Sequence, residues 1–167
     1  NVLNWALLNN DRLSVNKEQV SLIEMSKEVV KSIESLAARK NIKVEVKSDD
    51  ELIVYADRNM IQTSIRNLIS NALKFTPDDG NMTIIGEKSS SDISLFICDT
   101  GIGISEERLK TLFDVGHKDA SEDTDGNRST GFGLILTKEF IEKNGGAIRV
   151  ESIPDKGSTF EISFSSA

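Results

Sequence analysis

Apolar residues recur every three or four positions in several stretches of the chain, as they do in helices that bury one face. This spacing predicts a helix over residues 21–38, with Ser21 as its N-cap. A longer helix is expected to start after the N-cap Asp57 and to stop before Pro77. The same spacing predicts further helices over residues 105–113 and 130–143, and the end of a helix over residues 1–13.

Alternating apolar and polar residues, bounded by turn residues, predict six strands. They span residues 42–47, 52–56, 82–88, 93–99, 147–152 and 158–164. Short polar turns join the third to the fourth strand and the fifth to the sixth, which indicates antiparallel hairpins. Hairpins separated by helices, without a regular strand–helix–strand alternation, favour an α+β fold. We expect a two-layer α/β sandwich, with a mixed, mainly antiparallel sheet and helices on one face, over a doubly wound sheet.

Length and composition fit one globular domain. The chain has 167 residues, of which 38% are hydrophobic and 28% charged. No apolar run is long enough to span a bilayer and the start lacks a signal-peptide pattern, so a cytoplasmic setting is the expectation. The chain starts with Asn1 inside a helical pattern, so we interpret it as a fragment. Residues 1–13 would end a preceding helix and residues 14–167 would form the domain.

The counts of cysteine and histidine and the net charge argue against several classes of function. One cysteine and one histidine cannot form a disulfide or a structural zinc site, so any metal must bind to oxygen ligands. A net charge of -7 argues against tight nucleic-acid binding, which requires a basic surface. An anionic small ligand would need local cations.

Three polar residues form a stripe beside the apolar row of the longest predicted helix. Asn67, Asn71 and Lys74 lie four and three positions apart, so they share one face. Carboxamide oxygens suit a hard cation such as magnesium, and the lysine supplies a charge for a phosphate. The same pattern also fits a solvated helix edge.

Asp99 ends a strand whose inward-facing positions are otherwise apolar. A buried carboxylate needs a hydrogen-bond donor, and the amino group of adenine is one that would satisfy it. Gly101 and Gly103 follow and permit a flat ligand to lie close to the backbone. The alternative is an ordinary turn in which Asp99 caps the next helix.

Gly131 and Gly133 lie at the entrance of the helix predicted over residues 130–143. Backbone N–H groups at a helix start attract phosphate, and glycines permit its close approach. The pattern is neither a Walker loop nor a dinucleotide-binding fingerprint. Between the two predicted helices, residues 114–128 are polar with few apolar anchors, and we expect a mobile loop.

Taken together and in this order, the segments resemble the catalytic and ATP-binding domain of bacterial two-component sensor histidine kinases, within the gyrase, chaperone, histidine kinase and mismatch-repair ATPase superfamily. NLISNALKFTP resembles the N box, DTGIGI the first glycine box, LFD the F box and STGFGL the second glycine box. KGSTFEISF resembles the closing strand. The resemblance covers the chain from about Val20 onward and implies the Bergerat fold with a mobile ATP lid.

The resemblance implies roles for these residues. Asn71 would coordinate magnesium, Asn67 would line the same site, and Lys74 would contact phosphates. Phe75 would lie beside the nucleotide, and Asp99 would accept from the adenine amine. Further nucleotide-binding positions are Gly101, Gly103, Ile104, Phe113, Lys118, Arg128, Thr130, Gly131, Phe132, Gly133, Leu134 and Thr159.

The chain departs from the family pattern at a few positions. Ser129 stands where the second glycine box usually has glycine, and Phe132 where it has leucine, which could weaken nucleotide binding or lid closure. Phe75 replaces a frequent tyrosine. His117 lacks the context of the phosphoacceptor histidine and is interpreted as an exposed lid residue, while Lys118 and Arg128 also fit free surface cations.

The implied activity is transfer of the ATP γ-phosphate to a histidine on dimerisation helices that lie outside this chain, for signal transduction through a response regulator. Hydrolytic relatives carry a glutamate where this chain has Asn67, and a carboxamide cannot act as a general base. The rival functions are an ATPase clamp, a serine kinase of the anti-sigma type and a non-catalytic interaction module. The parent protein is expected to be a homodimer, with or without an inner-membrane anchor, and this domain is expected to contact neither nucleic acid nor membrane.

Overall fold

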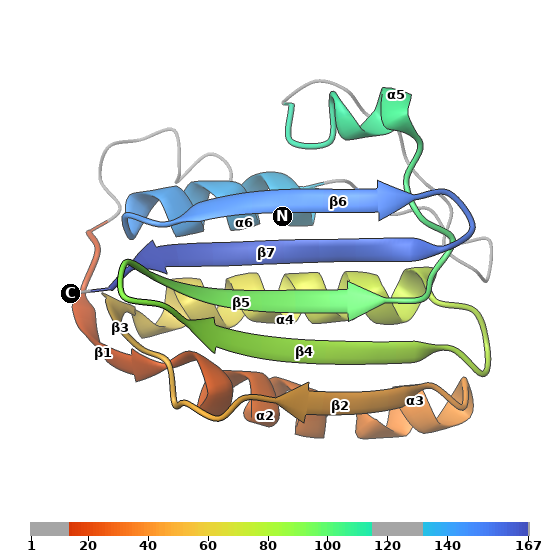
Figure 1. Cartoon of the computed structure of the whole chain (residues 1–167), viewed down its shortest axis with the longest axis horizontal. Coiled ribbons are helices and arrows are strands. Elements are labelled where there is room, and N and C mark those ends of the chain that lie inside the picture. The colour runs from red at the N-terminus through yellow and green to blue at the C-terminus, as the bar shows by residue number, and fades with distance from the viewer. Residues whose placement is uncertain (1–13, 115–131, 167) are drawn as a thin grey trace.

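A five-stranded sheet and a layer of helices form the molecule, and the computed structural model describes residues 14–114 and 132–166 (Figure 1). The strand order is β2-β4-β5-β7-β6, with β2 and β4 parallel and every other pair antiparallel. The longer helices cover one face of this sheet, and the short helix α5 (Glu106–Leu109) lies beyond its β6 edge (Figure 1). The strands are β2 Lys43–Lys47, β4 Asn81–Lys88, β5 Asp92–Asp99, β6 Ala147–Ile153 and β7 Gly157–Ser165. The predicted α+β sandwich with a mixed, mainly antiparallel sheet is confirmed.

A second, two-stranded sheet lies beside the helices. In it β1 (Lys17–Ser21) pairs antiparallel with β3 (Ile53–Asp57). The strand predicted over residues 52–56 therefore exists, but it belongs to this small sheet, and its partner β1 was missed. Only one residue of β1, Val20, is buried, so the segment carries no alternation that marks a strand.

Two helices stand where one was predicted over residues 21–38. They are α2 (Leu22–Ser32) and α3 (Glu34–Arg39), and Ile33 between them has φ -109° and ψ 6°. The Ile33 N–H donates to the carbonyl of Val30 at 3.1 Å, a tighter turn than the α-helical one. The prediction of one continuous helix is wrong, and Leu36, placed on its apolar row, is 50% exposed.

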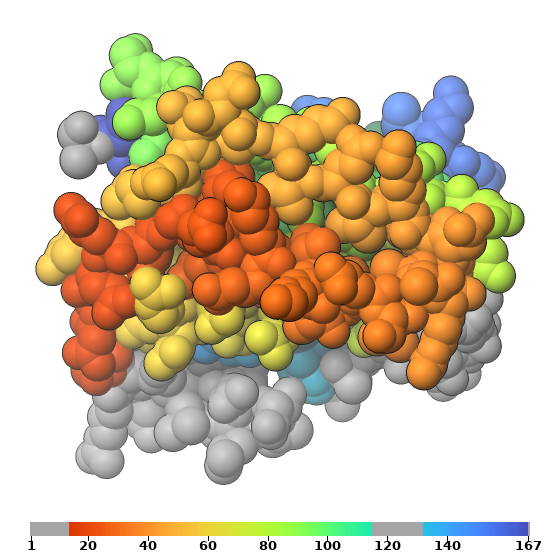
Figure 2. All heavy atoms as spheres, turned by 90° about the horizontal axis from the view of Figure 1, so that it is seen from below, coloured from red at the N-terminus to blue at the C-terminus, as the bar shows by residue number. Residues whose placement is uncertain are grey.

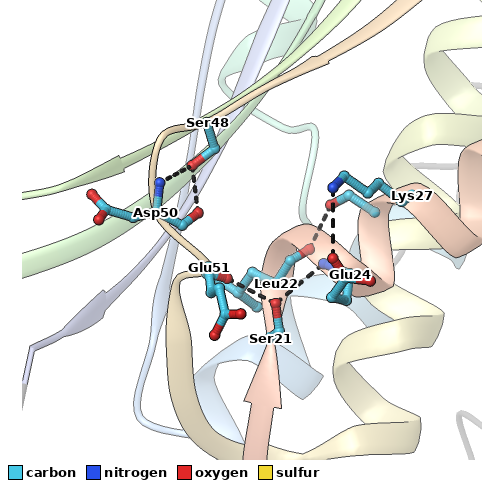
Figure 3. A network of polar contacts seen from close by, with 8 residues as sticks. Ser21, Leu22, Glu24, Lys27, Ser48, Asp50 and Glu51 are labelled. Atoms are coloured by element: carbon cyan, nitrogen blue, oxygen red, sulfur yellow. Dashed lines mark hydrogen bonds and ion pairs between the residues drawn. The ribbon is translucent and has the colours of Figure 1, made fainter.

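Ser21 caps α2, as its position predicted. Its Oγ accepts from the N–H of Glu24 at 3.2 Å and donates to the carbonyl of Glu51 at 2.8 Å (Figure 3). The cap therefore also fixes the connection between the two sheets. From the β2 edge, β1, α2, α3 and β2 cover most of the surface, coloured red to orange, and α4 shows beneath them in yellow (Figure 2).

The longest helix, α4 (Arg58–Phe75), runs behind the middle of the sheet (Figure 1). Asp57 caps it by accepting from the N–H of Met60 at 3.1 Å, and the helix ends before Pro77, as predicted. The other oxygen of Asp57 accepts from the N–H of Asn16, and its own N–H donates to the side-chain oxygen of the buried Asn144 at 2.8 Å. These bonds tie the start of α4 to the end of α6 (Phe132–Lys143).

The core lies between the helices and the inner face of the sheet. Residues without exposed surface come from both layers: Leu22, Val29, Ile61, Ile65, Ile69, Ile84, Leu95, Ile97, Ile141 and Ile162. The short helix α5 is Glu106–Leu109, so the helix predicted over residues 105–113 is too long. Within the described residues no helix is both long and apolar enough to cross a membrane.

Candidate functional site

Asp99 is the last residue of β5, and its side chain accepts hydrogen bonds from two backbone N–H groups. Its Oδ1 accepts from the N–H of Gly101 at 2.8 Å and from the N–H of Ser158 at 3.3 Å. Within the described residues, Oδ2 accepts no hydrogen bond. Burial raises the pKa of Asp99 above its ordinary value, although the two N–H groups act in the opposite direction. One oxygen is thus anchored and the other is available to an outside donor.

Gly101 brings the end of α4 against the segment that follows β5. A Cβ at this position would lie 2.5 Å from the carbonyl oxygen of Phe75 and 2.6 Å from Oδ1 of Asp99, closer than atoms can pack. The next residue, Ile102, donates its N–H to the same Phe75 carbonyl at 3.0 Å. Glycine therefore permits the contact between the predicted N box and the first glycine box.

Gly103 and Gly157 both have positive φ, at 72° and 127°, where glycine is favoured. A Cβ on Gly103 would meet the backbone of Ile153, and one on Gly157 would meet the carbonyl of Asp99. Ser152 joins the two segments, because its Oγ contacts both the N–H of Ile104 at 2.8 Å and the carbonyl of Gly157 at 2.9 Å. The turn between β6 and β7 thus packs directly against the segment around Asp99.

The second glycine box contacts α4 at Asn67, two turns before Phe75, where the first glycine box makes its contact. The side-chain Nδ2 of Asn67 donates to the carbonyl of Gly133 at 3.3 Å and to Oγ1 of Thr137 at 3.4 Å. A Cβ on Gly133 would lie 3.8 Å from the Asn67 side chain, which is ordinary contact. The first turn of α6 contains no acidic residue, so its backbone N–H groups keep their attraction for anions.

Asn71 and Lys74 follow Asn67 on the same face of α4. Asn71 is partly buried and, within the described residues, its side chain makes no hydrogen bond. Lys74 is exposed in the last turn of the helix. Within the described residues there is no cluster of histidine, cysteine and carboxylate ligands for a metal. Amide oxygens are the donors that this face offers to a hard cation.

Phe113 is partly buried and packs against the core, as does Leu134 of α6. The Nζ of Lys138, also on α6, lies 5.8 Å from the centroid of the Phe113 ring, within the range of a cation–π contact. This contact joins the residues on either side of the segment between α5 and α6.

The structure brings several of the predicted site residues into contact with another predicted segment. α4 contacts the first glycine box through Phe75 and the second through Asn67. Thr159 is separated from Asp99: it pairs with Cys98 of β5, whereas the preceding residue, the buried Ser158, pairs with Asp99. Successive strand residues face opposite sides of a sheet, so Thr159 lies away from Asp99. His117, Lys118, Arg128, Ser129, Thr130 and Gly131, and the loop expected over residues 114–128, apart from Asp114, lie outside the described residues.

Three residues that contact the predicted site segments were not predicted: Ser158, Ser152 and Thr137. Ser158 could have been found by placing the strand after Gly157 in register with the strand that ends at Asp99, since alternation then turns Ser158 inward. No sequence signal marks Ser152. Thr137 stands out only as a polar residue within an apolar helical row, and it is fully buried.

Comparison with known proteins agrees with this geometry. The model of the histidine kinase-, DNA gyrase B- and HSP90-like ATPase family matches residues 56–167. The chain belongs to this family. The matched part includes α4, both glycine boxes and the β6–β7 hairpin, and therefore every residue discussed above as part of the site.

The similar proteins are sensor kinases. The adaptive-response sensory kinase SasA of Crocosphaera subtropica is 36% identical over 92% of this chain, and the chain spans 40% of its length. The catalytic domain of histidine kinase ThkA in its nucleotide-free form superposes with a TM-score of 0.77 at 27% identity, covering 90% of this chain and 95% of that one. The structure of ThkA in complex with the response regulator TrrA has a TM-score of 0.78 at 24% identity, covering 99% and 46%.

Proposed function

We propose that the chain is the ATP-binding catalytic domain of a sensor histidine kinase. It would bind ATP with magnesium and present the γ-phosphate to a histidine on dimerisation helices outside the described residues. The observation that carries the proposal is the convergence on α4: Phe75 and Asn67, two turns apart on one helix, contact the two glycine-rich segments. A ligand with a base at one end and phosphates at the other fits this arrangement.

Each end of the ligand would meet a suitable partner. Oδ2 of Asp99 would accept from the adenine amine, while Gly101 and Gly103 allow the ring to approach the backbone. The phosphates would lie toward Asn71, Lys74 and the start of α6. Of the residues outside the described ranges, Lys118, Arg128 and Thr130 would belong to the lid over them, and Gly131 to its hinge.

The site residues fit magnesium in the role it takes in phosphate-binding sites. Magnesium usually keeps several water ligands and takes others from phosphates, so a few neutral protein oxygens suffice. Asn71 would supply one and Asn67 a second. When bound, the ion neutralises charge on the phosphates during transfer. The chain itself positions the nucleotide, and the nucleophile comes from the dimerisation helices.

Transfer is favoured over hydrolysis because, among the residues that the structure describes, no carboxylate stands one turn before Asn71 to act as a general base. Asn67 lies one turn before Asn71, where a carboxylate could activate water, but an amide cannot take a proton. We therefore expect ATP binding with little ATPase activity and no autophosphorylation by this chain alone. The natural partners would be its own dimerisation helices, in a homodimer, and the receiver domain of a response regulator.

A reconstitution tests this function. The chain is mixed with radiolabelled ATP, magnesium and a separately purified dimerisation domain of the parent protein. Acid-labile label on that domain, lost when its histidine is replaced by alanine, is the expected result. Rapid release of inorganic phosphate by the chain alone would point to an ATPase clamp, and absence of nucleotide binding at millimolar ATP to an interaction module. Either result would overturn the proposal.

A further inference from the structure

α4 and α6 pack against each other behind the sheet (Figure 1). Among the described residues, polar groups of Asn67, Gly133 and Thr137 join the two helices. The side chain of Asn67 reaches from α4 to the Gly133 carbonyl and the Thr137 hydroxyl on α6. The Thr137 hydroxyl also contacts the Gly133 carbonyl, at 2.7 Å. Thr137 has no exposed surface, so its hydroxyl needs partners within the protein.

The chemistry of these groups determines which way the Asn67 amide faces. A carbonyl oxygen can only accept, so Gly133 requires the amide nitrogen of Asn67. The single hydrogen of the Thr137 hydroxyl is directed to the Gly133 carbonyl, so toward Asn67 this hydroxyl can also only accept. Both partners therefore accept from the side-chain nitrogen of Asn67, which carries two hydrogens, and the side-chain oxygen of Asn67 points away from α6.

We infer that Thr137 is a positioning residue, which holds the Asn67 amide with its nitrogen on α6 and its oxygen presented to the metal and phosphates. This inference rests on the proposed function. Without the hydroxyl, the Gly133 carbonyl alone would restrain the amide through one long hydrogen bond of 3.3 Å. When a group that hydrogen-bonds to a metal ligand and orients it is removed, the metal affinity typically falls by about 10- to 100-fold.

The variant Asn67→Asp distinguishes two roles of Asn67, as a metal ligand and as a hydrogen-bond donor to α6. If Asn67 were only a metal ligand, Asn67→Asp would bind magnesium at least as well, because a carboxylate is the harder donor. If its nitrogen must contact Gly133 and Thr137, Asn67→Asp loses both hydrogen bonds and sets a negative charge against a carbonyl oxygen.

The experiment compares four variants of the chain: Thr137→Val, Thr137→Ser, Asn67→Asp and the control Ser26→Ala. Ser26 is matched to Thr137, since it is fully buried and its hydroxyl contacts the carbonyl four residues earlier, at 2.7 Å, but it lies on α2. Calorimetry measures the Kd of a non-hydrolysable ATP analogue with magnesium and with EDTA. Thermal unfolding without ligand reports on the fold.

We expect Thr137→Val to lose about 10-fold of the magnesium-dependent affinity, with the Kd in EDTA unchanged. Thr137→Ser and Ser26→Ala should keep the magnesium effect, and Asn67→Asp should lose it. A magnesium effect that persists in Thr137→Val, or that improves in Asn67→Asp, overturns the inference. An equal loss in Thr137→Val with and without magnesium, together with a lower Tm, also overturns it, because that pattern indicates a purely structural role. If the unaltered chain does not bind the analogue, the proposed function itself fails.

Discussion

Replacing Asp99 by asparagine tests how the site would recognise a base. Oδ1 of Asp99 accepts from two backbone N–H groups, of Gly101 and Ser158. In Asp99→Asn the side-chain oxygen must take over both bonds, because the amide nitrogen cannot accept. The nitrogen then occupies the position of Oδ2. An adenine amine would meet a donor where it needs an acceptor.

The expected loss of affinity follows from this mismatch. A hydrogen bond to a charged acceptor contributes about 1.5–3 kcal/mol, and a buried donor without a partner costs about 1–3 kcal/mol more. A total of about 3 kcal/mol or more raises the Kd for ATP by roughly 150-fold. The fold should not weaken, since the substituted side chain keeps both backbone bonds and no longer buries a charge.

Calorimetric titration with non-hydrolysable ATP and GTP analogues checks this expectation, and thermal unfolding is the control. Guanine presents an acceptor where adenine presents the amine, so Asp99→Asn should shift the preference from the ATP analogue toward the GTP analogue. A folded variant that binds the ATP analogue within about three-fold of the unaltered chain would refute the assignment of Asp99 as the base-recognising group.

Two further variants and a pH series follow from the same geometry. Gly101→Ala should lower the free energy of unfolding by about 1–3 kcal/mol in a denaturant titration, because its Cβ would press on the Phe75 carbonyl, whereas Gly133→Ala, which has room, should not. The folded state raises the pKa of Asp99, so as pH falls toward the ordinary range of a carboxyl group the folded state takes up this proton before the unfolded state does. This group's contribution to stability should therefore grow with falling pH while ATP affinity drops, and Asp99→Asn should show neither trend. Asn144→Leu should lower the Tm, because the backbone N–H of Asp57, at the start of α4, would lose its buried acceptor, the side-chain oxygen of Asn144.

The sequence predicted those elements whose own periodicity marks them. Buried positions recur every three to four residues over the 18 residues of α4, and the helix starts at a capping aspartate, so its bounds and its polar stripe were predictable. The β4–β5 hairpin was predictable for the same reason, since a polar turn joins two alternating runs.

Features that leave no signal in their own segment were not predictable. The break at Ile33 is a local tightening of one turn within an apolar row that continues across it. The strand β1 exists because it pairs with β3, more than thirty residues later, and not because of its own composition. The parallel pairing of β2 with β4 likewise depends on the connection through β3 and α4 that lies between them in the chain.

Within the site, the residues involved were easier to predict than the directions in which their side chains point. Asp99, Gly101 and Asn67 were assigned from motif spacing, and the structure brings each into contact with another predicted segment. The choice between Ser158 and Thr159 depends on a register of one residue, which turns the side chain to the opposite face. The hydrogen bond between Asn67 and Thr137 spans 70 positions and has no local signal.

The central claim is that three separate segments bind one molecule of ATP, and a backbone amide NMR titration of the isotope-labelled chain with ATP and magnesium tests it most directly. The account predicts saturable shifts that begin together at submillimolar nucleotide and gather at Gly101, Asn71 and Gly133. The amides of α2 and α3, on the far side of the helical layer, should not move. Absence of shifts at millimolar nucleotide, or shifts at one of the three segments alone, would contradict it.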